Sequence, residues 1–155
     1  SLPSGLSAGD QTAVNPLPDG HSVDDMDNWC EENARDLQSS GVPFVHGFCM
    51  CVKREVFDRI GYFDEESFPY GYGEENDFCI RTSDHGFRLN IAIDAFVFHA
   101  KSKSYLDDKR RKKLMNAGDV KLRDLHGSER VNRLVQSMER NPTLAKMRER
   151  SLELF

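Results

Sequence analysis

Three carboxylates stand within four positions in the stretch FPYGYGEENDFCIR, residues 68–81. They are Glu74, Glu75 and Asp77, and they follow directly after a segment of glycines and aromatic residues. The dipole of a helix favours each acidic side chain in its first turn by some tenths of a kcal/mol up to about 1 kcal/mol, so a structural role explains one or two of them. A carboxylate at such a position is also suited to general base chemistry, because it is ionised near neutral pH and can take a proton from a bound hydroxyl.

The segment before the acids favours a chemical role. Glycines such as Gly71 and Gly73 let the backbone approach a ligand closely. Aromatic rings can stack on sugar rings, and the rings that flank the acids are Phe68, Tyr70 and Tyr72. These residues are therefore candidates for substrate binding.

Two short helices are predicted around this stretch. Residues 74–86 predict a helix that ends at Gly86, and residues 53–60 predict a helix that stops at Gly61. Glycine is common at such ends because it can adopt the left-handed conformation. The three acids are therefore expected at the start of the helix over residues 74–86.

Strands are predicted on either side of these helices. The apolar run VPFVHGFCMCV, residues 42–52, predicts a buried strand, in which Gly47 marks a bend or a close backbone approach. Residues 87–93 and 95–100 supply one or two further strands. The expected fold class is α/β.

The two flanks of the chain are predicted to be helical. Ser22 can cap a first helix, with Asp25 three residues further on. From Tyr105 onward the pattern is all helix, with a first segment that ends at Gly118. Asn141 followed by Pro142 is typical of the start of a last helix. A mixed α and β body is thus followed by a helical tail.

The four cysteines are Cys30, Cys49, Cys51 and Cys79. Cys49 and Cys51 are two apart, so in a strand they would point to opposite faces. This spacing suits neither a disulfide between them nor a zinc site, which prefers Cys-x-x-Cys pairs. We expect buried, reduced thiols and hence an intracellular protein.

The charge of the chain is unevenly distributed. A net charge of −5 argues against a general nucleic-acid binder. However, KRRKK at residues 109–113 places five basic residues in succession. Such a run is often only a solvated segment. The alternative is an anionic partner, either a diphosphate or a lipid-linked molecule at a membrane surface.

Four motifs in order carry a resemblance to a known family. They are Gly47-Phe48-Cys49 with Arg54, Gly61-Tyr62-Phe63-Asp64-Glu65, Gly73-Glu74-Glu75-Asn76-Asp77-Phe78-Cys79-Ile80-Arg81, and Val97-Phe98-His99. Their order and spacing resemble the second half of family 2 glycosyltransferases. The tail, with HGSERV and NPTLAKMRE, is similar to the helical extension of one bacterial branch.

The resemblance implies a fold and an activity. It implies a partial GT-A domain, Rossmann-like, with a mixed sheet flanked by helices. Residues 1–104 would form the acceptor-side half and residues 105–155 a C-terminal helical extension. The implied activity is inverting transfer of a sugar from a nucleotide-sugar donor to an acceptor hydroxyl.

The resemblance also assigns roles to residues. Glu75 would be the catalytic base, although the family more often has Asp there, and Glu74 would bind acceptor or sugar hydroxyls. Asp77 would orient the helix or pair with Arg81 at i+4. His99 would approach the metal or the donor diphosphate. The residues expected to bind substrate are Tyr70, Tyr72, Gly73, Arg81, Lys101 and Lys103.

One half of the family pattern has no counterpart here. The nucleotide-binding half and its Asp-x-Asp are missing, so the divalent metal, manganese or magnesium, would be held mainly by residues outside this chain. This half alone is expected to be inactive. The alternative is a non-catalytic carbohydrate-binding or interaction module that is derived from a transferase.

The implied partners are a nucleotide-sugar donor and a glycan, lipid-linked or protein acceptor. No nucleic-acid partner is expected. The expected location is the cytoplasm, with peripheral contact at the inner face of the membrane as a further option.

Overall fold

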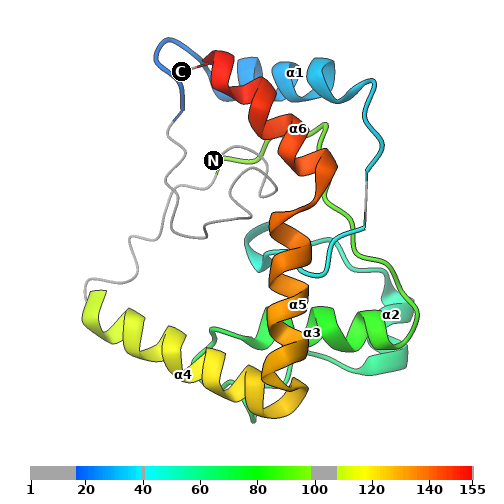
Figure 1. The fold of residues 1–155 in the computed structure, drawn as a ribbon, viewed down its shortest axis with the longest axis vertical. Coiled ribbons are helices and arrows are strands. Elements are labelled where there is room, and N and C mark those ends of the chain that lie inside the picture. Colours follow the sequence, from blue (N-terminus) through cyan, green and yellow to red (C-terminus); the bar gives the residue numbers. More distant parts are fainter. Residues whose placement is uncertain (1–16, 40, 99–107, 155) are drawn as a thin grey trace. The chain divides into compact units, whose positions relative to one another are not determined.

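A computed structural model of the chain describes residues 17–39, 41–98 and 108–154 (Figure 1). These residues form α-helices and short 3-10 helices (η). In chain order they are α1 (Val23–Ala34), η1 (Gly47–Cys49), α2 (Arg54–Ile60), α3 (Glu74–Asp84), α4 (Asp108–His126), α5 (Ser128–Glu139), α6 (Pro142–Ser151) and η2 (Leu152–Leu154).

The expected mixed sheet is wrong for this part of the chain. The described residues contain no strand, and β-type pairing occurs only at the single positions Val42 and Leu89. The α/β class and the Rossmann-like, partial GT-A arrangement are therefore corrected to an all-helical architecture with irregular connections. The predicted strand at 42–52 instead contains η1, although His46 and Met50 on either side of it have extended backbone, with ψ of 138° and 123°.

Hydrogen bonding explains why the strand predictions fail. A strand needs a neighbouring strand to bind its N–H and C=O groups. Here side chains bind them instead: the N–H of Val45 donates to Cys79 Sγ at 3.4 Å, and the N–H of Gly47 donates to a carboxylate of α3 at 2.9 Å. The N–H of Phe96 likewise donates to Asp27 Oδ1 at 2.7 Å. In the described residues, these apolar segments thus contain extended backbone without a partner strand.

The described residues belong to two compact units. The first contains 17–39, 41–42, 90–98 and 137–154, and the second contains 43–89 and 108–136. Helix α5 begins in the second unit and ends in the first.

In the first unit, α1 packs against α6. The predicted cap of α1 is confirmed: Ser22 Oγ accepts from the N–H of Asp25 at 3.1 Å, and the N–H of Ser22 donates to Asp25 Oδ2 at 2.7 Å. The predicted start of α6 is also confirmed, since Asn141 Oδ1 accepts from the N–H of Leu144 at 3.1 Å. The buried face of α1 is formed by Met26, Cys30 and Ala34.

In the second unit, α3 packs against both α2 and α4. The core residues there are Phe44, Phe68, Cys79, Ile80, Leu122 and Val131. The predicted end of α2 is confirmed, because Gly61 follows it with φ of +79° and donates its N–H to Phe57 O. Helix α3 ends at Asp84, and Gly86 follows with φ of +83°.

Helix α4 does not end at Gly118, as the sequence predicted, but continues to His126. A Cβ at Gly118 would lie 1.5 Å from the carbonyl oxygen of Tyr72. The glycine therefore serves a close approach between α4 and the segment that precedes α3, and does not terminate the helix. Contact with a distant backbone decided this role.

The cysteine prediction is half right. All four thiols are free, and Cys30 and Cys79 are buried as expected, but Cys49 and Cys51 are exposed. Burial raises the pKa of Cys30 to about 12 and that of Cys79 to about 11. Across the described ranges, no helix combines the length and the apolar character needed to cross a bilayer.

The approach at Gly118 makes a testable prediction. Alanine in place of glycine inside a helix ordinarily raises the free energy of unfolding by about 1 kcal/mol. For Gly118→Ala we expect a loss of about 1–3 kcal/mol, because the added methyl group overlaps the carbonyl of Tyr72. Urea denaturation measures the difference. Asn116→Ala, at an exposed position of the same helix, is the control and should be slightly stabilising; a gain in both variants would refute the close approach.

Candidate functional site

The segment before α3 has an unusual backbone. Gly71, Tyr72 and Gly73 have consecutive positive φ angles of +75°, +64° and +130°. A tyrosine in this region is strained, at a cost of about 1–2 kcal/mol, because its Cβ approaches the following carbonyl oxygen. Gly73 has no room for a side chain, since a Cβ would lie 2.6 Å from the ring of Phe68. Such strain is found where surrounding structure enforces it, often at functional sites.

The predicted aromatic residues have different environments here. Phe68 belongs to the core and is only 5% exposed, and its ring lies against the backbone at Gly73. Tyr70 is 68% exposed, and Tyr72 is half-buried. Of the three, Tyr70 presents the largest surface to a ligand.

Glu75 lies in the first turn of α3 with an accessible carboxylate. Its side chain is 36% exposed, and Oε2 accepts the N–H of Gly47 at 2.9 Å. His46 Nδ1 lies 3.9 Å from the same oxygen. A Cβ on Gly47 would lie 2.8 Å from Glu75 Oε1, so glycine is needed for the carboxylate to lie against this backbone. The close approach predicted at Gly47 is thus confirmed.

Glu74 is the less accessible neighbour. Its Oε2 is buried and has no hydrogen-bond partner in the described protein. Burial, and then the charge of the adjacent Glu75, raise the pKa of this carboxyl. A Cβ on Gly71 would lie 3.4 Å from Glu74 Oε1, so the backbone at Gly71 lies close to this carboxylate.

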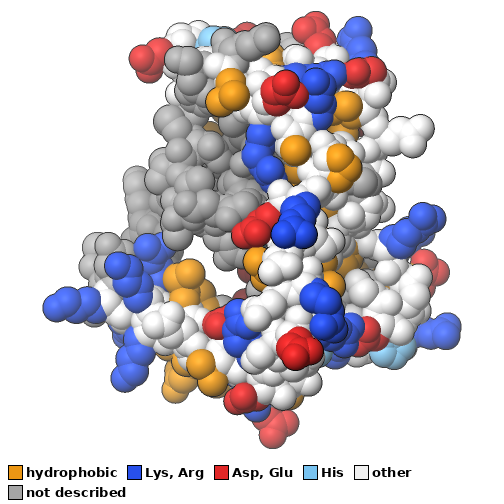
Figure 2. Space-filling model, in the orientation of Figure 1, with side chains coloured by type: hydrophobic (Ala, Val, Ile, Leu, Met, Phe, Trp, Pro, Cys, Tyr) orange, Lys and Arg blue, Asp and Glu red, His pale blue; other side chains and the backbone are white. Residues whose placement is uncertain are grey.

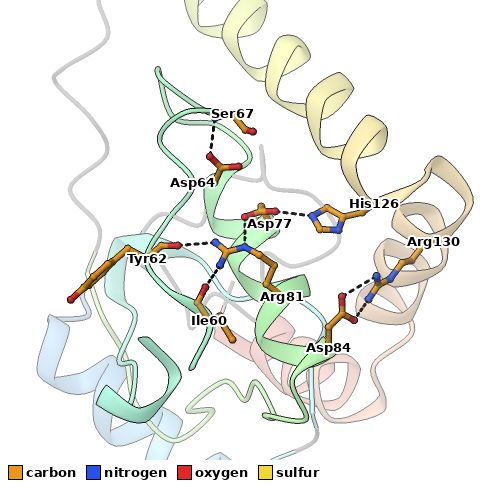
Figure 3. Close-up of polar contacts among 9 residues, drawn as sticks. All are labelled: Ile60, Tyr62, Asp64, Ser67, Asp77, Arg81, Asp84, His126 and Arg130. Atoms are coloured by element: carbon orange, nitrogen blue, oxygen red, sulfur yellow. Dashed lines mark hydrogen bonds and ion pairs between the residues drawn. The ribbon is translucent and has the colours of Figure 1, made fainter. Parts of the chain in front are cut away.

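Asp77 is buried and fully engaged (Figure 3). It is 3% exposed, its Oδ2 accepts from Arg81 Nε at 2.7 Å, and its Oδ1 lies 2.8 Å from His126 Nε2. The predicted pairing of Asp77 with Arg81 is confirmed. Both oxygens have protein partners, so Asp77 is better suited to a structural role than to act as a base. We call the contacts of Asp77 with Arg81 and His126 the brace.

Arg81 extends the brace to the end of α2. Its Nη1 donates to the carbonyl of Ile60 at 3.0 Å and its Nη2 to the carbonyl of Tyr62 at 2.9 Å (Figure 3). These acceptors include the last residue of α2 and the loop after Gly61. The guanidinium group expected to bind substrate therefore has its nitrogens bound within the protein.

His126 is the contributor that sequence reasoning missed. It is the last residue of α4, 49 positions after Asp77, and its side chain is 11% exposed. Because an ionised carboxylate only accepts hydrogen bonds, Nε2 of His126 carries the hydrogen in this pair. Its position before Gly127 signals only a helix end, so no local pattern could have linked it to α3.

Three of the predicted residues, His99, Lys101 and Lys103, lie outside the described residues. Among residues 17–39, 41–98 and 108–154, no group of three or more His, Cys, Asp or Glu side chains could hold a metal ion. The described residues therefore do not form a metal site by themselves.

The neighbouring carboxylates of Glu74 and Glu75 differ in burial and in hydrogen bonding. Glu75 is partly exposed and accepts a hydrogen bond from a backbone N–H, whereas Glu74 is partly desolvated and its Oε2 has no hydrogen-bond partner among the described residues. Such contrasting environments allow two adjacent acids different roles. An accessible carboxylate can accept a proton, and a buried oxygen without a partner can accept a hydrogen bond from a hydroxyl.

Comparison with known proteins confirms the resemblance seen in the motifs. The family described as "Glycosyltransferase like family 2" matches residues 29–117. The low-salt glycan biosynthesis hexosyltransferase Agl10 of Haloferax volcanii is 31% identical over 80 residues, which cover 45% of this chain and 25% of that protein. The chain thus spans about a quarter of the length of this relative. No solved structure gives a significant match.

The buried brace predicts a contrast between two aspartates of α3. Asp77→Asn should lower the free energy of unfolding by about 3 kcal/mol, because it leaves Arg81 and His126 without their anion in a buried position. Asp84→Asn is the matched control: its pair with Arg130 is exposed, so the loss should stay below about 1 kcal/mol. Urea denaturation of both variants measures this, and equal losses would rule out the brace.

Burial of Glu74 predicts a pH-dependent effect on stability. Its folded pKa is raised, so ionisation costs stability as the pH rises above the ordinary value of 4.5. Glu74→Gln should therefore raise the free energy of unfolding at pH 7, and this gain should vanish below about pH 4, where the carboxyl is protonated in both states. The check is urea denaturation at several pH values. Glu65→Gln, on the exposed surface, should show no such gain, and a gain at low pH would contradict the assignment.

Proposed function

This chain belongs to the glycosyltransferase-like family 2, and on that basis we propose that it supplies the acceptor side of a sugar-transfer reaction. The donor would be a nucleotide sugar, and the acceptor a hydroxyl of a glycan, a lipid-linked molecule or a protein. The observation that carries the proposal is the pair of adjacent carboxylates in contrasting environments at the start of α3, within the matched residues.

The proposed step is an inverting, in-line displacement. The carboxylate of Glu75 accepts the proton of the acceptor hydroxyl as its oxygen bonds to the anomeric carbon. The bond between that carbon and the phosphate oxygen breaks, and the electron pair leaves with the nucleoside diphosphate. Inversion follows because the nucleophile enters opposite to the leaving group.

Accessibility supports Glu75 as the base. Its carboxylate is exposed enough to meet an acceptor, and the N–H of Gly47 fixes its position through one oxygen. A positioned base contributes about 10²- to 10⁴-fold to the rate. Asp77, the other predicted candidate, is buried and has both oxygens bound, so it would hold α3 in place and not exchange protons with substrate.

The unmet oxygen of Glu74 supports a role in binding. A buried acceptor without a partner costs stability unless a ligand supplies a donor. A hydroxyl of the acceptor or of the transferred sugar is such a donor, and Tyr70 offers an exposed ring close by in the sequence. Glu74 would then bind substrate, as the resemblance implies.

The donor side is proposed from the resemblance alone. His99 would approach the donor diphosphate or its metal, with Lys101 and Lys103 neutralising phosphate charge. Manganese or magnesium, held mainly by residues outside this chain, would stabilise the leaving diphosphate when bound. The cytoplasm remains the proposed location.

Glu75→Gln tests the proposal in the complete native polypeptide. Hydrolysis or transfer is measured with a panel of UDP- and GDP-sugars in the presence of manganese or magnesium, and UDP binding is measured separately. We expect kcat to fall by about 10²- to 10⁴-fold, because the amide cannot accept the proton. UDP affinity should not change, because Glu75 acts on the acceptor side.

Matched variants separate the roles of the two acids. Glu74→Gln should mainly raise KM for the acceptor, and Glu65→Gln, an exposed glutamate of the same unit, should leave both constants unchanged. Equal activity in Glu75→Gln and the unaltered protein would move the base elsewhere. Saccharide binding without turnover of any donor would favour the carbohydrate-binding module.

A further inference from the structure

Helix α1 forms one wall of an open pocket in the first unit. The pocket has a volume of about 460 Å³, which falls in the range of about 300–1,000 Å³ that is typical of small-molecule sites. It is lined by Gly20, His21, Asp25, Asn28, Trp29 and Glu32. These residues belong to α1 and to the turn before it, and the candidate site at the start of α3 contains none of them.

One face of α1 carries most of the side chains that line the pocket. At 3.6 residues per turn, four of them lie within an arc of about 100° around the helix, namely Asp25, Asn28, Trp29 and Glu32. Trp29 lies at the edge of this arc that is nearest to Met26 on the buried face, and its side chain is half-buried. The tryptophan is therefore held by packing in its unit while part of it lines the pocket.

The turn before α1 positions His21. The N–H of His21 donates to the carbonyl of Pro18 at 3.1 Å, and Gly20 in this turn has φ of +79°, which glycine adopts readily. His21 Nδ1 lies 3.1 Å from the carbonyl oxygen of Asp19. Because a carbonyl only accepts, Nδ1 carries the hydrogen, and Nε2 of the neutral ring can accept a hydrogen bond from a ligand.

The cap of α1 orients Asp25. Its Oδ2 accepts from both the N–H and the hydroxyl of Ser22, each at 2.7 Å. These two bonds, the backbone one first, lower the pKa of Asp25, so the carboxylate is ionised near neutral pH. Both bonds go to Oδ2, and Oδ1 can therefore accept from a ligand. A pocket whose groups are already oriented loses less entropy when a ligand binds.

The charge of α1 excludes an anionic ligand. Within its bounds the helix carries five acidic residues and no basic residue. Acidic side chains stand at the surface at the top of Figure 2, where α1 lies in Figure 1. A phosphate or carboxylate in the pocket would be repelled by Asp25 and Glu32. A metal ion is not favoured either, since no cluster of His, Cys, Asp or Glu among the described residues could hold one.

The pocket combines hydrogen-bond donors and acceptors beside an aromatic ring. The carboxylates of Asp25 and Glu32 accept, the indole N–H of Trp29 donates, and the amide of Asn28 does both. An organic cation could lie against the indole, but it would leave the donors of Trp29 and Asn28 without an acceptor. A ligand that carries several hydroxyls around an apolar face matches all of these groups.

We propose that this pocket binds a neutral saccharide. The C–H face of a sugar ring would lie against Trp29, whose ring is large, rigid and only half-buried. The hydroxyls, which can each donate and accept, would bond to Asp25, Asn28 and Glu32. Binding here uses residues of the first unit and involves no transfer, so it goes beyond the function proposed for Glu74 and Glu75.

Tryptophan fluorescence of the full chain tests the proposal, because Trp29 is its only tryptophan. The neutral probes are maltotriose, mannotriose and triacetylchitotriose, and the comparison probes are glucuronate as an anionic sugar and choline as an organic cation. We expect at least one neutral trisaccharide to shift the emission to shorter wavelength in a saturable manner, because the sugar displaces water from the indole. Glucuronate and choline should cause no such shift.

Variants of α1 test which face binds the saccharide. Glu32→Ala should raise Kd about tenfold and Asn28→Ala about fivefold, because each removes a hydrogen bond and the first involves a charged group. Both positions are exposed and alanine favours a helix, so urea denaturation should show no loss of stability. Glu31→Ala is the matched control: it removes the same charge from an exposed position about 100° away around the helix, and should bind like the unaltered chain.

No shift with any of the three trisaccharides, or tighter binding of choline, would overturn the proposal. Equal weakening by Glu31→Ala and Glu32→Ala would also overturn it. Glu74→Gln with Glu75→Gln should leave the shift unchanged, and its loss would assign the saccharide to the candidate site instead. Because no nucleotide sugar is present, the outcome does not depend on sugar transfer.

Discussion

The second unit depends on one buried interaction, the carboxylate of Asp77 held between Arg81 and His126. A buried anion is unfavourable unless it is paired and hydrogen-bonded, and here both oxygens have partners. Through Arg81 the same anion reaches the carbonyls of Ile60 and Tyr62, so one charge joins the start of α3, the end of α2 and the end of α4. The carboxylates of Glu74 and Glu75, at the start of the same helix, are held on this fixed framework.

Close backbone approach is the second constraint. Gly47, Gly73 and Gly118 each occupy a place where a Cβ would collide with a neighbouring side chain or carbonyl. Together they let the strained Tyr72, which precedes α3, lie against α4 and let Glu75 lie against the backbone at Gly47. The family match covers the first two of these glycines and ends one residue before Gly118. The match thus includes residues 108–117 of α4, and Gly118 continues the same helix against Tyr72.

Acidic and basic residues occupy the starts of two different helices of this unit. Acidic residues occupy the first turn of α3, where the helix dipole favours them, and basic residues occupy the start of α4, where it does not. The acids at the favoured position need no ligand to be stable, so only the burial of Glu74 and its unmet oxygen point to a substrate.

Local chemistry was available from the sequence alone. The cap at Ser22, the start of α6 at Asn141, the end of α2 at Gly61 and the pair of Asp77 with Arg81 all depend on residues no more than four positions apart. The family was likewise evident from four spaced motifs.

Tertiary structure decided the rest. Within the described ranges, extended segments found side-chain partners and formed no sheet, and α4 continued through Gly118. His126 met Asp77 from 49 positions away, and neighbouring acids came to differ in burial. Burial and the partners of backbone groups are set by residues far apart in the chain, and no local pattern encodes them.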